Sequence, residues 1–332
     1  MKVVFVAPYA LPMSIGGFQG QVYHIFEELK NLGIDVCWHN FEKDEINDAD
    51  ILQVMSTDPS MISLIKRSKN RGVKVVLTPM LGSRVKSNRY MKAALFLSKI
   101  PQLCSAHKAT AEIVRNADYF TPLCSFEANR INYVYGIDAN RITVIPNGID
   151  KTFLEKPPLK KTLPFENYIL IVGRIEENKN QLNLIMACNA LDMNLIIVGE
   201  PGSDGTHYLE ECRRMAGDNI HFWGLEKNPL VLKYLYQQAS LTVIPSYSEM
   251  VPLVAFESLS QGTPVICTNR CGITGDVIPG LFFTGISVNA IKKNIEKTRL
   301  FDKNKISNKG IFSWTDIAEQ YVSVYKSVLS KK

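Results

Sequence analysis

The chain is organised around the stretch SEMVPLVAFESLSQG, residues 248–262. The apolar run at 241–244 before it predicts a buried strand, and Pro252 is typical of the first turn of a helix. A strand therefore leads directly into a helix at this point of the chain. Glu249 is expected in the connecting loop, and Glu257 in the second helical turn, on a face that can look back towards the loop.

The start of this predicted helix is suited to binding an anion. The backbone N–H groups of Leu253 and Val254 are free there, and the helix dipole places positive charge beside them. Carboxylates repel phosphate but accept hydrogen bonds from vicinal hydroxyls, as an acidic residue does from ribose in dinucleotide-binding folds. We therefore expect Glu249 and Glu257 to hold sugar hydroxyls on either side of a diphosphate, which makes the predicted ligand a nucleotide sugar.

Short apolar runs alternate with amphipathic stretches along the whole chain, and this alternation predicts an α/β fold. In the first half the predicted strands are 3–6, 34–37, 51–54, 73–77 and 142–145, with helices such as 21–31 and 60–70 between several of them. In the second half the strands are 168–172, 195–198, 220–222, 241–244 and 264–267, with helices at 180–191, 208–216, 229–239 and 253–261. Such alternation predicts parallel sheets covered by helices on both faces. A length of 332 residues predicts two domains.

Two further candidate sites follow the first strand of each half. Arg174 and Lys179 flank a predicted helix start after Gly173, where a guanidinium and an ammonium group can grip phosphate oxygens. The alternative is a pair of solvated cations. Gly16 and Gly17 lie between the first strand and the first helix, where backbone amides can approach phosphate closely. The alternative there is a plain flexible loop.

Residues 83–115 form a basic segment. Its cations are Arg84, Lys86, Arg89, Lys92, Lys99, Lys108 and Arg115, interleaved with Tyr90, Met91, Leu95, Phe96, Leu97 and Ile100, and its only acid is Glu112. Such a segment can lie on an anionic membrane surface, or line an acceptor site for a phosphorylated lipid or glycan. The alternative is a helix pair packed on the sheet with its lysines in water. No helix-turn-helix, zinc or aromatic RNA-binding pattern is present, so nucleic acid is not expected as a partner.

The composition is that of a reduced globular protein. The seven cysteines show no Cys-x-x-Cys pair and no zinc-ligand spacing, so they are expected to be small core residues of a cytoplasmic protein. No uninterrupted apolar run is long enough to cross a bilayer. The net charge of +6 is too modest to decide between partners. Asp48 and Asp50 precede a strand, so we expect them at the sheet edge opposite to the ligand, and we predict no metal site.

Four motif groups occur in an order that resembles the retaining GT-B glycosyltransferases of glycosyltransferase family four. They are Gly16-Gly17, the string Ile145-Pro146-Asn147-Gly148, the pair Arg174 and Lys179, and Glu249 with Glu257 in an E-x7-E arrangement. The resemblance implies an α/β fold of the GT-B type, with two Rossmann-like, doubly wound parallel-sheet domains facing a central cleft. It implies an acceptor-binding domain at 1–150, a linker at 151–166, a nucleotide-sugar-binding domain at 167–312, and a C-terminal helix at 313–332 that crosses back to the first domain.

The resemblance also implies roles for individual residues. Those implied to bind the donor are Gly16, Gly17, Gly173, Arg174, Lys179, Trp223, Leu225, Glu249, Leu253, Val254 and Glu257. Of these, Arg174, Lys179 and Glu249 are implied to be catalytic, and neither a metal nor a cofactor is expected. Met80 and Arg84 are implied at the acceptor site. Some relatives place a histidine where this chain has Met80, which cannot donate a hydrogen bond or carry a proton.

The function implied by the resemblance is transfer of a sugar, with retention of anomeric configuration, from a UDP- or GDP-linked donor to a glycan or lipid-linked acceptor. This activity belongs to cell-surface polysaccharide or glycolipid synthesis, in the cytoplasm or on the inner face of the cytoplasmic membrane. Two alternatives bind the same donor, namely a nucleotide-sugar 2-epimerase of the same fold and a catalytically silent nucleotide-sugar-binding subunit. An epimerase needs carboxylates near the sugar in the first domain, and the sequence offers no clear candidate for them.

Overall fold

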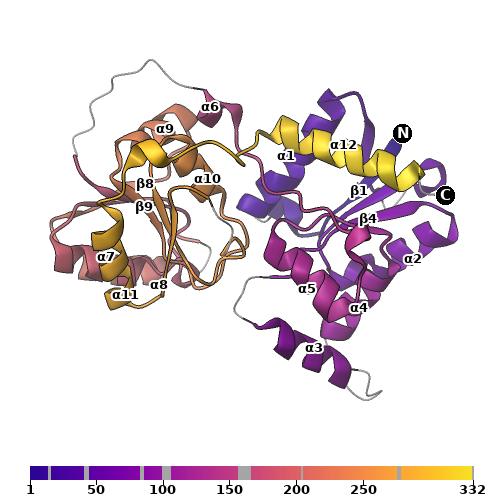
Figure 1. Cartoon of the computed structure of the whole chain (residues 1–332), viewed down its shortest axis with the longest axis horizontal. Helices are drawn as coiled ribbons and strands as arrows, with labels where there is room; N and C mark the ends of the chain where they lie inside the picture. The colour runs from indigo at the N-terminus through magenta and orange to yellow at the C-terminus, as the bar shows by residue number, and fades with distance from the viewer. Residues whose placement is uncertain are drawn as a thin grey trace. The chain divides into compact units, whose positions relative to one another are not determined.

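The computed structural model describes residues 1–13, 16–40, 45–82, 86–98, 106–155, 166–202, 205–274 and 278–330. The chain divides into two compact units (Figure 1). Unit 1 contains Met1–Gly82, Lys86–Gly148 and Phe312–Lys332, whereas unit 2 contains Ile149–Ile311. Each unit is built on one parallel sheet, as the alternation of strands and helices predicts.

Unit 1 has a five-stranded sheet in the order β2-β1-β3-β4-β5, in which all neighbours are parallel. The strands are β1 (Lys2–Val6), β2 (Asp35–Trp38), β3 (Ile51–Met55), β4 (Lys74–Thr78) and β5 (Tyr119–Phe120). The helices are α1 (Gly17–Asn31), α2 (Ile62–Asn70), α3 (Asn88–Leu97), α4 (Ala106–Asn116), α5 (Ser125–Tyr135) and α12 (Trp314–Ser330), and 3₁₀ turns cover Leu11–Met13, Glu45–Asp48, Pro59–Met61 and Ala139–Arg141. The central strands are buried almost throughout, which explains why they read as uninterrupted apolar runs.

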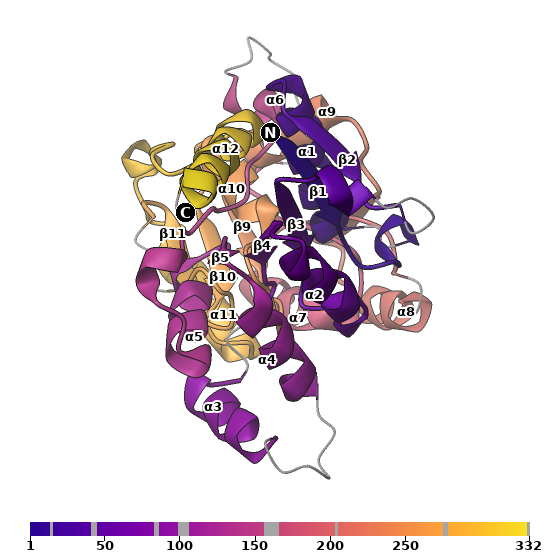
Figure 2. The same ribbon diagram turned by 90° about the vertical axis from the view of Figure 1, so that its right-hand side faces the viewer.

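Helices cover both faces of this sheet (Figure 2). α2 and α4 pack together on one face, and α1 packs with α12 on the other. Buried hydroxyl groups tie α12 to the sheet. The Tyr325 hydroxyl donates to Oε1 of Gln53 over 3.0 Å, and the Tyr321 hydroxyl lies 3.0 Å from Oγ1 of Thr78. The last helix of the chain is therefore part of the core of unit 1.

The prediction of a strand at 142–145 is wrong. The fifth strand of the sheet is instead β5, and only an isolated bridge joins the predicted segment to Phe120. The N–H groups of Thr143 and Ile145 do donate to the carbonyls of Phe120 and Pro122, over 3.0 and 2.9 Å. Pro122 has no N–H with which to return a hydrogen bond, so the ladder cannot continue.

Unit 2 has a six-stranded parallel sheet in the order β11-β10-β9-β6-β7-β8. The strands are β6 (Ile169–Val172), β7 (Leu195–Val198), β8 (Ile220–Gly224), β9 (Leu241–Ile244), β10 (Val265–Thr268) and β11 (Leu281–Thr284). The helices are α6 (Lys151–Leu154), α7 (Gln181–Leu191), α8 (Thr206–Met215), α9 (Pro229–Gln238), α10 (Leu253–Ser260) and α11 (Val288–Thr298), with 3₁₀ turns at Glu177–Lys179 and Lys303–Lys305. α7, α8 and α11 pack on one face, whereas α6, α9 and α10 pack together on the other. The edge strand β11 was not predicted.

The strand order of unit 2 reverses between β6 and β9. From β6 the chain moves outward through β7 to β8, and then returns to β9 and moves the other way to β11. In doubly wound sheets a crevice opens at such a reversal, outside the carboxyl ends of the two strands, and ligands bind there. The segments that leave these two strand ends carry Lys179 and Glu249, which are 70 residues apart in the sequence. The topology therefore brings the two motifs together.

Two boundaries differ from those expected. The first residues of the expected linker at 151–166 form helix α6, because Asp150 caps it by accepting from the Thr152 N–H over 2.7 Å and because Phe153 is buried. Helix α10 begins at Leu253, so Pro252 is its N-cap and does not belong to its first turn.

Candidate active site

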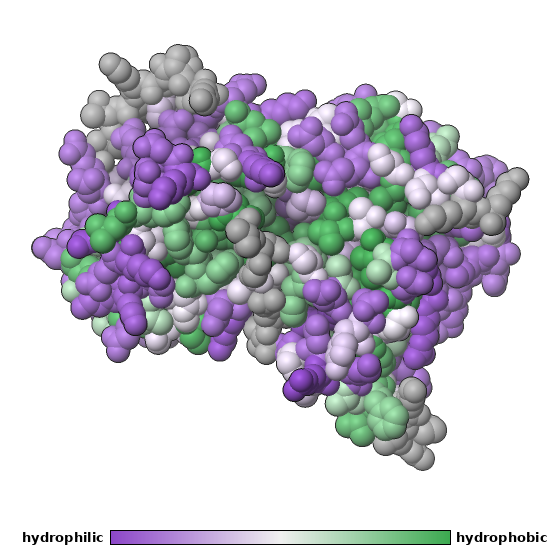
Figure 3. Space-filling view, in the orientation of Figure 1, coloured by the Kyte–Doolittle hydropathy of each residue, from purple (hydrophilic) through white to green (hydrophobic). Residues whose placement is uncertain are grey.

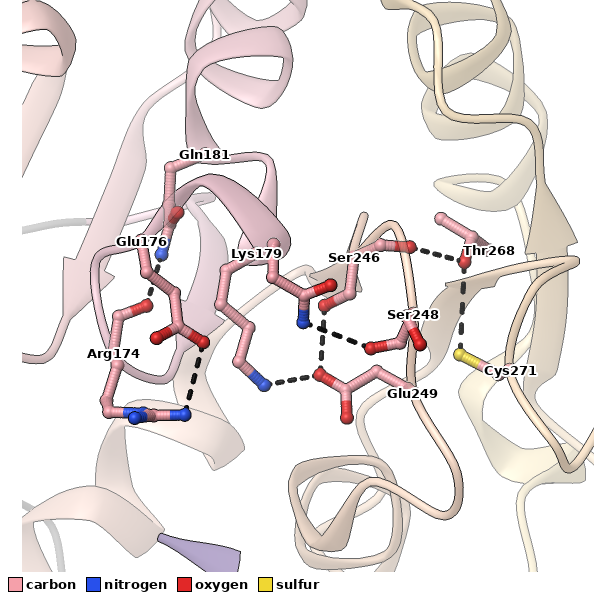
Figure 4. A network of polar contacts seen from close by, with 10 residues as sticks. Arg174, Glu176, Lys179, Gln181, Ser246, Ser248, Glu249, Thr268 and Cys271 are labelled. Carbon is pink, nitrogen blue, oxygen red and sulfur yellow. Dashed lines mark hydrogen bonds and ion pairs between the residues drawn. The ribbon is translucent and has the colours of Figure 1, made fainter. Parts of the chain in front are cut away.

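The carboxyl ends of β6 and β9 border a small pocket in unit 2. It is lined by both strand ends, the segments that follow them and the start of α10, with Ile171, Val172, Gly173, Lys179, Gln181, Ile244, Pro245, Ser246, Glu249, Pro252 and Val254. Four of the residues implied to bind the donor therefore surround one pocket, namely Gly173, Lys179, Glu249 and Val254. Figure 4 shows the polar contacts of this region.

An ion pair between Lys179 and Glu249 forms the polar centre of the pocket (Figure 4). Nζ of Lys179 donates to Oε1 of Glu249, which also accepts from Oγ of Ser246 over 3.1 Å. The two side chains are only 23% and 16% exposed, so both charges are largely withdrawn from water. An ammonium group has three donors and a carboxylate has a second oxygen, so both groups keep hydrogen-bonding capacity for a ligand.

Two asparagines outside the quoted motifs hold the Glu249 loop in place. Nδ2 of Asn178 donates to the carbonyl of Ser248 over 3.1 Å, and Nδ2 of Asn180 donates to that of Pro245 over 3.0 Å. Asn180 has a φ of 57°, a left-handed conformation that asparagine tolerates better than most residues. An asparagine just before a helix indicates a turn, and this could be recognised from the sequence. The hydrogen bond from Asn180 to a loop 65 residues away could not be predicted.

A glycine pair lets the loops after β6 and β7 approach each other. Gly199 directly follows β7 with a φ of 146°, and a Cβ atom there would lie 2.0 Å from the carbonyl oxygen of Gly173. A side chain at this position would therefore push the two loops apart. Gly199 was not among the predicted site residues, although a glycine at the end of an apolar run is a known signal of close backbone approach.

The N-terminus of α10 supplies free backbone donors beside the pocket. The first N–H that bonds within this helix is that of Ala255, which donates to the carbonyl of Pro252 over 3.1 Å. The N–H groups of Leu253 and Val254 make no hydrogen bond within the part of the chain that the structure describes. They can bind an anion, and the helix dipole favours negative charge at this position.

Glu257 does not line this pocket, and its environment differs from that of Glu249. Its Oε2 accepts from the Tyr236 hydroxyl over 2.7 Å. Burial raises the pKa of Glu257 to about 7, with the hydrogen bond from Tyr236 acting against the rise and the charge of Asp150 adding to it. Glu249 is therefore in an ion pair with Lys179, whereas Glu257, the other glutamate of the E-x7-E motif, is partly protonated near neutral pH.

The raised pKa of Glu257 predicts how stability changes with pH. The folded state binds this proton more tightly than the unfolded chain, whose value is near 4.5, so stability is lost as the pH rises through 7. We expect Glu257→Gln to equal the wild type below about pH 4.5 and to be more stable by roughly 1–3 kcal/mol above pH 8. Urea unfolding followed by circular dichroism measures this difference. An identical pH dependence in both proteins would contradict the prediction.

Arg174, Trp223, Leu225 and Leu253 were also implied to bind the donor and do not line the pocket. Arg174 follows β6, is half-exposed, and donates through its guanidinium to Oε1 of Glu176 over 3.2 Å (Figure 4). Trp223 lies near the carboxyl end of β8, and the exposed Leu225 comes directly after that strand. Arg174, Trp223 and Leu225 lie at the same edge of the sheet as Lys179.

Unit 1 carries the remaining predicted residues. Gly16 is the N-cap of α1 and Gly17 is its first residue, so both lie at the start of the first helix. Met80 follows β4 with a φ of 53°, which is uncommon for a residue with a side chain. Arg84 lies outside the described residues. The basic segment 83–115 is described in part, as the helices α3 and α4, which contact each other.

Buried Glu127 and Arg130 support the loop after Met80. Oε1 of Glu127 accepts from the N–H of Leu81 over 2.7 Å, and Arg130 donates to the carbonyls of Leu81 and Lys86 over 2.8 and 2.6 Å. Burial raises the pKa of Glu127, while its backbone hydrogen bonds lower it. Neither residue was singled out from the sequence, because charged residues on a helix usually face water.

Neither the acids nor the cysteines of the described chain form a metal site. Asp48 and Asp50 lie at the amino edge of the unit 1 sheet, as expected, and Oδ2 of Asp50 accepts from the N–H of Lys2 over 2.8 Å. The six cysteines that the structure describes are free thiols. Among the described residues, no group of three His, Cys, Asp or Glu side chains is placed to hold a metal ion.

A family of known proteins matches the segment that carries the pocket. Residues 155–299 match the family model described as glycosyl transferases group 1. A D-inositol 3-phosphate glycosyltransferase of Segniliparus rotundus is 25% identical over an alignment of 256 residues, and the match covers 69% of this chain and 57% of that protein. For its counterpart in Nocardia farcinica the identity is 27% over an alignment of 267 residues, and the match covers 71% of this chain and 58% of that protein. The chain thus spans less than three fifths of the length of these curated relatives.

Solved structures share the fold over almost the whole chain. Sucrose-phosphate synthase from Thermosynechococcus elongatus has a TM-score of 0.73 at 17% identity, with 100% of both chains covered. Anabaena Alr3699/HepE in complex with UDP has a TM-score of 0.69 at 16% identity, with 98% of this chain and 100% of that chain covered. The fold is GT-B. The expectation of two doubly wound parallel-sheet domains of this type is therefore confirmed.

Proposed function

We propose that this chain is a glycosyltransferase that moves a sugar from a UDP- or GDP-linked donor to a glycan or lipid-linked acceptor. One observation carries the proposal: the ion pair of Lys179 with Glu249 and the start of α10 line a single pocket at the strand reversal of unit 2. The match of residues 155–299 to glycosyl transferases group 1 supports it, as does the UDP complex of the structurally similar HepE. We place the reaction in cell-surface polysaccharide or glycolipid synthesis.

The residues in and near the pocket match what glycosyl transfer needs. Negative charge grows on the β-phosphate as its bond to the sugar breaks, and groups that bind this charge more strongly in the transition state accelerate the step. Lys179, Arg174 and the N–H groups of Leu253 and Val254 are the donors proposed for it, in place of a divalent ion. Glu249 orients Lys179 and offers its second oxygen to a sugar hydroxyl.

Retention is part of the proposal. The acceptor oxygen would bond to the anomeric carbon on the face from which the phosphate departs, and its proton would pass to an oxygen of that phosphate. The Met80 thioether cannot take this proton, and we propose the phosphate as the base. A product with the anomeric configuration of the donor, assigned by NMR coupling constants, is expected. An inverted product would refute this part of the proposal.

Incubating the full chain with individual UDP- and GDP-sugars tests the function. We expect one donor to raise the melting temperature and to release nucleoside diphosphate at a rate that increases with added acceptor. An isomeric nucleotide sugar as the product would instead show the 2-epimerase. Binding without release would show a silent binding subunit. Loss of release on addition of EDTA would refute independence from a metal.

We also propose that α3 docks on an anionic membrane surface, the inner face of the cytoplasmic membrane. Tyr90, Phe96 and Leu97 are exposed on this helix, and Figure 3 shows apolar surface gathered over it. The cations on the helix and just before it are Lys86, Arg89 and Lys92. Exposed apolar and basic side chains on one helix are typical of helices that lie in a membrane interface. Within the described chain, no helix has both the length and the apolar character to cross a bilayer.

Vesicle sedimentation tests the docking of α3. The chain should bind vesicles that contain phosphatidylserine at low salt and lose most of this binding at high salt. The double variant Phe96→Ser, Leu97→Ser should bind at least about tenfold more weakly, because two large apolar side chains no longer enter the interface. Leu300→Ser, which removes an exposed leucine from unit 2, is the matched control. Equal binding by the double variant and the wild type would refute the docking.

A further inference from the structure

Unit 1 has a second pocket, at the carboxyl ends of β1 and β2. Its volume is about 260 Å³, and its aromatic lining comes from Phe5, Tyr9, Tyr23, Trp38 and His39. The carboxyl edge of a doubly wound sheet is the edge at which ligands bind. None of these residues was predicted to contact the donor or the acceptor.

The aromatic side chains hold Trp38 in one orientation. Its ring stacks on Phe26 with the centroids 4.7 Å apart, and it meets Phe5 and Tyr23 edge-on at 6.0 and 5.6 Å. Trp38 nevertheless stays partly exposed. A platform that is already rigid before binding loses little conformational entropy when a ligand packs on it.

The lining indicates an uncharged ligand with an apolar face. Among the described residues, no Lys, Arg, Asp or Glu lines the pocket, and His39 is the one basic side chain of this lining. Its polar groups include the hydroxyls of Tyr9, which is 86% exposed, and of Tyr23, and neither makes a hydrogen bond within the described residues. A pyranose ring has an apolar C–H face and a hydroxyl-bearing edge. The volume is below the usual range for drug-sized ligands, roughly 300–1,000 Å³, so it fits one ring and not a chain of them.

We infer that this pocket binds the neutral terminal sugar ring of the acceptor, with Trp38 under the ring and Tyr9 at its edge. The inference rests on the proposed function and adds the class of acceptor, an uncharged pyranose and not a sugar phosphate. It extends the acceptor site beyond Met80 and Arg84. It also sets this chain apart from the D-inositol 3-phosphate glycosyltransferases, whose name specifies a phosphorylated substrate.

Tryptophan fluorescence of the full chain tests the pocket directly. The probes are the methyl glycosides of glucose, galactose, mannose and N-acetylglucosamine, and the matching sugar 6-phosphates. We expect at least one neutral glycoside to change the emission of the wild type, and this change to disappear in Trp38→Phe. Tyr9→Ala should weaken the binding about tenfold, because an exposed aromatic contact is lost. Tyr133→Ala removes an exposed tyrosine of α5 outside the pocket and should bind like the wild type.

Three outcomes would overturn the inference: no neutral glycoside binds, a sugar phosphate binds more tightly than its neutral partner, or Tyr9→Ala binds like the wild type. Release of nucleoside diphosphate, measured on the same preparations, distinguishes this inference from the proposed function. Release from a donor without any glycoside binding would refute the pocket assignment alone. Glycoside binding without release from any donor would refute the proposed function, and with it the acceptor role of the pocket.

Discussion

Replacing Lys179 by alanine is expected to lower the rate of sugar transfer at least about a hundredfold. Lys179 is the cation that lines the pocket together with the start of α10, so the variant loses a donor to the departing phosphate. It also leaves Glu249, only 16% exposed, as an unpaired carboxylate where a diphosphate should bind. Both the turnover number and the affinity for nucleoside diphosphate should fall, as measured by initial release rates and by calorimetric titration.

The variant Glu249→Ala distinguishes the two roles proposed for the ion pair, which are phosphate binding by Lys179 and sugar binding by Glu249. The rate of transfer should again fall at least about a hundredfold, because the sugar loses its hydroxyl contact and Lys179 loses its orientation. Nucleoside diphosphate should still bind, because Lys179 and the N–H groups of α10 remain. Loss of diphosphate binding together with transfer would show that Glu249 acts on the phosphates and not on the sugar.

Lys66 and Glu112 provide the matched control, because they form a Lys–Glu pair on the surface of unit 1. Their side chains are 51% and 38% exposed, so little is lost when either is removed. Lys66→Ala and Glu112→Ala should therefore transfer sugar at the wild-type rate. A Lys179→Ala protein that is as active as these controls would show that the diphosphate does not bind in the pocket of unit 2.

Gly199→Ala is expected to destabilise unit 2 by about 3 kcal/mol and to reduce transfer sharply. The added Cβ would lie 2.0 Å from the carbonyl oxygen of Gly173, and the φ of 146° is strained for alanine. A small shift of the backbone cannot relieve this clash, because both glycines are held by hydrogen bonds. The N–H of Gly173 donates to the carbonyl of Val198 over 2.9 Å, and the N–H of Gly199 donates to that of Gly224 over 2.8 Å. The loops after β6 and β7 would have to separate, which displaces Gly173 from the pocket. Urea unfolding followed by far-UV circular dichroism measures the loss.

Gly20→Ala is the control for this substitution. Gly20 lies in α1, and nothing within 4 Å would meet an added Cβ. Alanine is favoured over glycine in a helix by up to about 1 kcal/mol, so this variant should be as stable as the wild type or slightly more stable. If Gly199→Ala is as stable as the wild type, the two loops can separate at no cost. The close approach of the Gly173 carbonyl would then not require a glycine at position 199.

The parallel-sheet architecture was predictable because its signals are local. β1, β3, β4, β6, β7 and β9 are buried strands, and a buried strand reads as a short apolar run whichever strands lie beside it. The two errors in the predicted strands of unit 1 also have local causes. β5 has two residues and gives almost no pattern, whereas 142–145 has the pattern of a strand but runs beside Pro122.

The sequence by itself determined two parallel α/β units and most of the residue types around the pocket of unit 2, since strand runs, glycine turns and helix starts each depend on a few consecutive residues. Only the tertiary structure decided that Lys179 pairs with Glu249 and that position 199 has no room for a side chain beside Gly173. It also decided that Glu257 accepts a hydrogen bond from Tyr236 outside the pocket. These contacts depend on which strand ends become neighbours at the reversal between β6 and β9. That arrangement is set by packing among residues far apart in the chain, which no local pattern records.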